Sequence, residues 1–193
     1  MTRTAAPTNS RTRGITAIIE GFFAAGWFGW GTADAPQSLV PLLSVGQIVA
    51  VLVVLGGIVT VVRSRGQRTP MADPAVRGRY NMIVFAEFAI LGAGALTLSV
   101  AGLSDWTAVW ICAGVGLHFV PLARLFTDLW LVPLAAAVTT VAGVALIVGL
   151  TTDTAPSTVT GVGAGLCLLL AAVASLVGAD RSPDSIAGLA EQP

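Results

Sequence analysis

Three ionisable residues lie within apolar stretches long enough to cross a membrane: Glu20, Glu87 and His118, the only histidine of the chain. A charged side chain at that depth is costly, so such residues are rare unless they pair, bind a ligand or exchange protons. Carboxyl and imidazole groups can hold a proton or a cation and can act as general acid and base. These three residues are therefore the candidates for chemistry.

The three residues are expected at a similar depth. Glu20 lies about six residues, and Glu87 about seven, into stretches that start on the side of the N-terminus, and His118 lies about five residues before the end of a stretch that returns there. At about 1.5 Å per residue, each is roughly 8–10 Å from that face. We therefore predict one polar layer, with the three side chains pointing into the centre of a helix bundle.

Further residues are predicted to support this layer. Tyr80 lies seven residues before Glu87, which is two helical turns. Pro121 has no N–H to donate to the carbonyl of Leu117, so an unpaired acceptor is expected beside His118.

Arg124 and Asp128 lie four residues apart, where one apolar stretch turns into the next. That spacing predicts a local salt bridge that closes the turn. The alternative role for the two residues is a gate over the polar layer.

The elements that must position these residues are six apolar stretches, each about as long as a membrane-spanning helix. They cover residues 14–31, 38–62, 80–101, 106–123, 129–150 and 156–178. With 55% hydrophobic and 10% charged residues, the composition differs from that of soluble domains. We predict an all-α polytopic membrane protein, a compact bundle of six transmembrane helices in three hairpins over 14–178, with disordered tails at 1–13 and 179–193.

The arginines predict the orientation. The chain has no lysine, and in the six-helix topology all ten arginines fall on the side of the N-terminus, whereas the opposite loops carry only Asp34, Asp105 and Asp153. The positive-inside rule then places both termini in the cytoplasm. The amino-acid usage favours a GC-rich bacterial genome, and hence a bacterial plasma membrane. Ala33-Asp34-Ala35 has the small-x-small pattern of a signal-peptide cleavage site, but a glutamate and two tryptophans before it argue against cleavage.

Two segments favour particular packing or contacts. The segment 63–79 carries five arginines, two glycines and two prolines, so we expect a flexible cytoplasmic connection that sets topology and can touch anionic headgroups. Gly161 and Gly165 form a GxxxG pattern, which packs helices either within one chain or between protomers. The five tryptophans are expected to anchor the helices at the two membrane interfaces.

The polar layer gives the leading functional hypothesis, a small proton- or cation-coupled transporter or channel. Two carboxyl groups face at most one imidazolium, and no other basic residue is expected equally deep, so a balanced structural ion pair does not account for all three residues. Six short helices are few for a carrier, so a homodimer is expected. The partners are then the lipid bilayer and a small ion or molecule.

Two alternatives remain open. One is an intramembrane enzyme that acts on a lipid-like substrate, in a metal-dependent form with Glu20, Glu87 and His118 as ligands of zinc or iron. The other is a non-catalytic membrane subunit or assembly factor, in which the three residues hold the bundle together. No cofactor is predicted, and a formal net charge of zero gives no reason to expect nucleic-acid binding.

Overall fold

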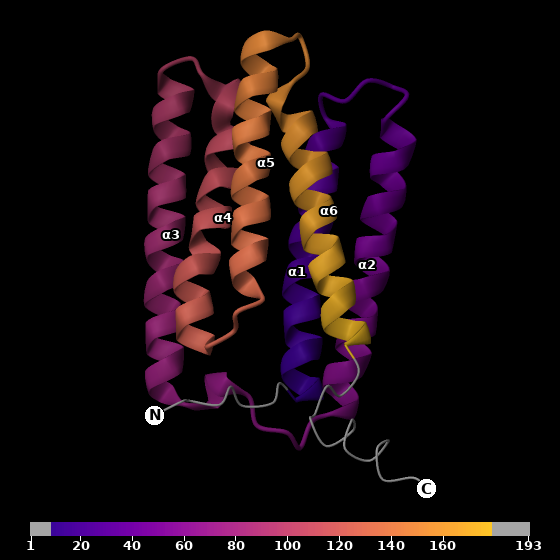
Figure 1. Cartoon of the computed structure of the whole chain (residues 1–193), viewed down its shortest axis with the longest axis vertical. Helices are drawn as coiled ribbons and strands as arrows, with labels where there is room; N and C mark the ends of the chain where they lie inside the picture. The colour runs from indigo at the N-terminus through magenta and orange to yellow at the C-terminus, as the bar shows by residue number, and fades with distance from the viewer. Residues whose placement is uncertain (1–8, 179–193) are drawn as a thin grey trace, which may run out of the picture.

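The computed structural model describes residues 9–178, and this part of the chain is all-helical, as predicted. Its six long helices are α1 (Ser10–Thr32), α2 (Val40–Arg63), α3 (Pro74–Val100), α4 (Thr107–Phe126), α5 (Leu131–Thr151) and α6 (Pro156–Val177). Short 3-10 turns, η1 (Pro70–Ala72) and η2 (Ser104–Trp106), precede α3 and α4. The helices run up and down alternately, so α1 begins and α6 ends at the same end of the bundle (Figure 1).

Five helices are long and apolar enough to cross a membrane, namely α2 to α6, and the protein is therefore a multi-pass integral membrane protein. The sequence predicts six such helices. The sixth, α1, has 23 residues and is long enough, but it is not apolar enough to count with the other five. A glutamate, five glycines and two tryptophans lower its hydropathy. The helix runs beside α2 and α6, which cover much of its surface (Figure 1).

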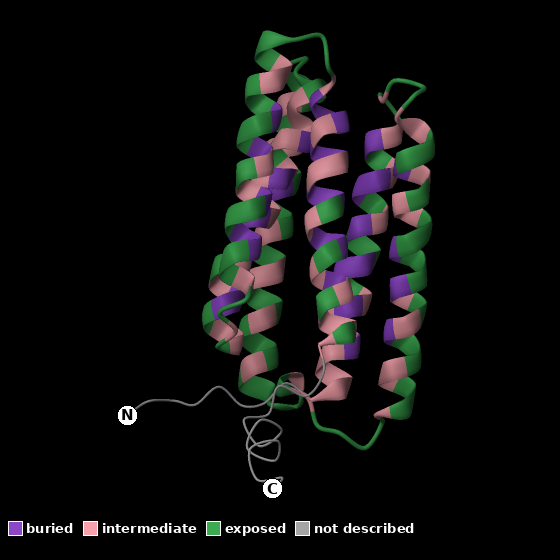
Figure 2. Cartoon of the chain, turned by 45° about the vertical axis from the view of Figure 1, so that its right-hand side comes forward, coloured by how far each residue is buried: buried purple, intermediate pink, exposed green. Residues whose placement is uncertain are grey.

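The helices form two groups of three. α1 packs between α2 and α6, and α4 packs between α3 and α5, while contacts of α6 with α5 and α4 join the groups. Buried positions follow the lines where helices meet, and exposed positions cover the outside (Figure 2). α3 is the most peripheral helix, because Leu91 is its only buried residue.

Small residues allow the closest helix contacts. Gly161 of α6 lies against Gly31 of α1, where an added Cβ would overlap the neighbouring backbone. Gly165 packs against the ring of Phe28. Gly14 of α1 and Gly57 of α2 form a second close contact between two helix backbones. The GxxxG pattern thus packs helices within one chain, which decides between the two uses left open by the sequence.

The end of the bundle that carries the arginines is tied together by hydrogen bonds. The Arg11 guanidinium donates to the carbonyls of Arg65 and Gln67, at 2.9 and 3.1 Å. The side chain of Asn9 caps α1 by accepting from the backbone N–H of Thr12 at 2.9 Å. The segment 63–79, which was expected to be flexible, is therefore held against the start of α1. Its last residues already form the first turn of α3, which begins at Pro74.

The prediction of a disordered tail over 1–13 is wrong for residues 10–13, which form the first turn of α1. Arg13 shows why this turn is ordered: its guanidinium donates to the carbonyls of Ser175 and Leu176, at 3.0 and 3.1 Å. These are among the unpaired carbonyls at the negative end of α6, where a cation is favoured. The rest of the predicted tails, residues 1–8 and 179–193, lie outside the described residues.

Candidate functional site

The site begins with the antiparallel pair α3 and α4. Contacts along this pair join Gly94 to Trp110, Leu91 to Gly114, Glu87 to His118 and Tyr80 to Phe126. Residue numbers fall on α3 as they rise on α4, so the two helices are matched over most of their length. The indole N–H of Trp110 also donates to the carbonyl of Leu91 at 3.1 Å, which fixes the register.

Glu87 and His118 meet in the middle of this interface. Nδ1 of His118 lies 2.9 Å from Oε2 of Glu87, and the two side chains are 12% and 15% exposed. The contact is an ion pair when the imidazole is protonated and a hydrogen bond when it is neutral with its proton on Nδ1. Within residues 9–178 no other pair of charged side chains comes this close. Each group offsets the cost of burying the other.

Glu20 does not join this pair. Its side chain is buried in the other group of helices, where Oε2 accepts a hydrogen bond from the Ser175 hydroxyl of α6 at 3.2 Å. The predicted single layer at the bundle centre is therefore wrong. The depth of each residue follows from sequence position, but α3 packs at the edge of the bundle against α4, whereas α1 packs against α2 and α6.

The other predicted supporting residues lie closer to the arginine-bearing end. Tyr80 packs against Phe126 with ring centroids 6.1 Å apart, two turns along α3 from Glu87. Pro121 lies inside α4, one turn beyond His118, and lines a groove between α3 and α4.

The predicted salt bridge between Arg124 and Asp128 is wrong. Arg124 is exposed, and the Asp128 carboxylate instead accepts a hydrogen bond from the backbone N–H of Trp130 at 3.0 Å. The reason is local: α4 ends at Phe126, and Thr127 adopts a left-handed conformation with φ 56°. The spacing of four residues therefore does not place the two side chains on one helix face.

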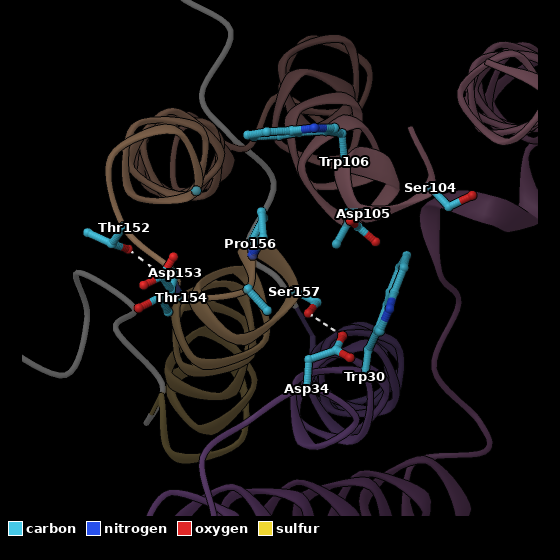
Figure 3. Close-up of a pocket in the computed structure, with 13 residues that line it drawn as sticks. Trp30, Asp34, Ser104, Asp105, Trp106, Thr152, Asp153, Thr154, Pro156 and Ser157 are labelled. Atoms are coloured by element: carbon cyan, nitrogen blue, oxygen red, sulfur yellow. Dashed lines mark hydrogen bonds between the residues drawn. The ribbon is translucent and has the colours of Figure 1, made fainter. Parts of the chain in front are cut away.

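A pocket of about 490 Å³, which was not predicted from the sequence, lies at the opposite end of the bundle (Figure 3). It is lined by Asp34, Asp105 and Asp153, one from each loop at that end, and by Trp30 and Trp106. No basic side chain from residues 9–178 lines it. From the sequence alone, the acids indicate topology and the tryptophans are expected as interface anchors. A sequence clue was available, since two of the three loops flank their aspartate with serine or threonine and all three lack arginine.

Within the pocket, Asp34 is held by α6. Its Oδ2 accepts a hydrogen bond of 2.6 Å from the hydroxyl of Ser157, in the first turn of that helix (Figure 3). The contact fixes the α1–α2 loop against α6, with the carboxylate near the positive end of the helix.

No family model, curated protein or solved structure matches this chain. No three His, Cys, Asp or Glu side chains gather as metal ligands in the described part of the chain, so Glu20, Glu87 and His118 form no common metal site there. What the arrangement offers is a titratable pair within two membrane helices and a negatively charged pocket at one end.

Proposed function

We propose that this membrane protein carries or conducts protons or small cations, with Glu87 and His118 as the group that exchanges the proton. The observation that carries the proposal is the 2.9 Å contact between Nδ1 of His118 and Oε2 of Glu87. A carboxyl and an imidazole at that distance can share a proton and pass it on, and His is the side chain best suited to do so near neutral pH. Both side chains keep some exposure at the α3–α4 edge of the bundle.

The rest of the charge distribution supports the same function. The pocket lined by Asp34, Asp105 and Asp153 raises the local concentration of cations at its mouth. Glu20 supplies a second buried carboxyl group, and it has no basic partner among residues 9–178.

The orientation that we propose is N-in and C-in, in a bacterial plasma membrane. It is supported by the eight arginines between residues 9 and 178, which all lie in α1's first turn, the end of α2, the α2–α3 connection, the start of α3 or the end of α4. A reporter enzyme that is active only outside the cytoplasm, fused after Pro193, should be inactive, and the same reporter inserted after Asp153 should be active. The reverse pattern contradicts the orientation.

The function is tested with purified protein in liposomes that hold an impermeant pH-sensitive dye. A pH step is imposed while valinomycin and potassium prevent a membrane potential from building up. We expect the pH gradient to collapse faster than in protein-free vesicles, and parallel runs with sodium or potassium gradients identify a cation other than the proton. If folded protein moves neither protons nor cations, the proposal is wrong and the role of a non-catalytic subunit gains support.

A further inference from the structure

A second surface of α3 and α4 carries chemistry that the proposed function does not use. It is a groove of about 430 Å³, here called the arginine groove, on the arginine-bearing side of the Glu87–His118 pair. Its lining consists of Arg79, Met82 and Ile83 from α3, and Val120, Pro121, Arg124 and Leu125 from α4.

The groove combines two guanidinium groups with an apolar floor. Arg79 and Arg124 are exposed, come from different helices and form no ion pair with an acid among residues 9–178. Within the described part of the chain, no acidic side chain lines the groove. Its other five lining residues have hydrocarbon or thioether side chains, whose only hydrogen-bonding group is the weakly accepting sulfur of Met82.

The position of the groove identifies its surroundings. α3 and Ser104–Phe126 are both long and apolar enough to span the membrane, and the groove lies near the end of α4 and the start of α3. α3 is the edge of the bundle, with large exposed apolar side chains such as Phe85 and Phe88. The groove is therefore bordered by hydrocarbon on one side and by the headgroup region at its arginine-bearing end.

We propose that the arginine groove binds an anionic phospholipid. The phosphate would be held by the guanidinium groups of Arg79 and Arg124, since the planar fork of arginine suits phosphate oxygens. The start of an acyl chain would lie on Met82, Ile83 and Val120. A soluble phosphate would satisfy the two charges but would leave the apolar floor uncovered.

Such a lipid would also act on the neighbouring pair. Ile83 lies one helical turn from Glu87, and Pro121 lies one turn from His118, so the lipid would bridge the same two helices just beyond the titratable contact. α3 has no extensive contact with a long helix other than α4. A bound lipid should therefore hold α3 in place, whether or not the protein transports ions.

The test measures binding by purified protein in a neutral detergent. Phosphatidylglycerol is titrated against the thermal midpoint and against the lipid-bound fraction seen by native mass spectrometry, with phosphatidylcholine as the zwitterionic comparison. We expect phosphatidylglycerol alone to raise the midpoint. The double variant Arg79→Gln/Arg124→Gln should bind it about 30-fold more weakly, from the loss of two near-surface charges.

The matched control is Arg65→Gln/Arg68→Gln, which removes two exposed arginines of the α2–α3 connection that do not line the groove. This control should bind like the wild type, and equal weakening in both double variants would mean that general charge attraction, not the groove, holds the lipid. Inorganic phosphate at millimolar concentration provides the other arm. If it gives the same stabilisation or displaces the lipid fully, the site is a phosphate site and the lipid proposal is wrong.

Discussion

Gly161→Ala is expected to cost the protein about 1–3 kcal/mol of stability or more, although it adds a single methyl group. An added Cβ at this position of α6 would overlap the Cα of Gly31 and come within 2.8 Å of the carbonyl oxygen of Trp27. Both obstacles are backbone atoms of α1, so they cannot rotate away as a flexible side chain would. The helices would have to separate along a contact that includes the buried Trp27 and Phe28.

The matched control is Gly143→Ala in α5, where an added Cβ meets nothing within 4 Å. In a helix interior alanine is favoured over glycine by about 1 kcal/mol, so this variant should be as stable as the wild type or more stable. The two substitutions are chemically identical, and the thermal midpoint in detergent should fall for Gly161→Ala but not for Gly143→Ala. Equal midpoints for the two variants would contradict the close α1–α6 contact.

The helices themselves follow directly from the sequence, because an apolar stretch of membrane-spanning length has few other structures open to it. The predicted ends of the last two stretches, 129–150 and 156–178, differ from those of α5 and α6 by at most two residues. α1 shows the limit of that argument. The sequence predicts this helix but does not explain why it is less apolar than the others. The reason is that α2 and α6 pack against it.

The sequence predicts one polar layer of Glu20, Glu87 and His118, but only Glu87 and His118 meet. Which helices are neighbours depends on packing, and position along a helix does not determine it. That packing is set by details such as Gly31 against Gly161, where two helices meet without side chains between them. The acidic pocket was missed for a related reason, because its three aspartates come from three loops that only the folded bundle brings together.

Glu87→Gln is expected to reduce proton movement through the protein at least about a hundredfold while the fold survives. Glutamine has nearly the size of glutamate, and its amide can still hydrogen-bond to Nδ1 of His118, but it cannot take up and release a proton. The loss follows from the usual contribution of a positioned acid or base, which is about 10²–10⁴-fold. The measurement is the rate at which an imposed pH gradient collapses in liposomes, normalised to the amount of folded protein.

Thr97→Val is the matched control on the same helix. It also replaces a polar group within α3, but the Thr97 hydroxyl is exposed and bonds only to the carbonyl of Ala93, so transport should be unchanged. His118→Gln should lose transport as Glu87→Gln does, and the double variant should be no slower than either, because residues that act as one unit are not additive.

Stability separates this mechanism from a structural role of the same contact. If Glu87 and His118 only hold α3 against α4, Glu87→Ala and His118→Ala should each lower the thermal midpoint, with a coupling of about 0.5–3 kcal/mol between them. Glu87→Gln would then transport like the wild type, because the hydrogen bond remains. The proposed mechanism requires the opposite result, in which Glu87→Gln keeps the wild-type midpoint and loses the flux. A single charge-neutralising substitution thus distinguishes a group that carries a proton from one that only holds two helices together.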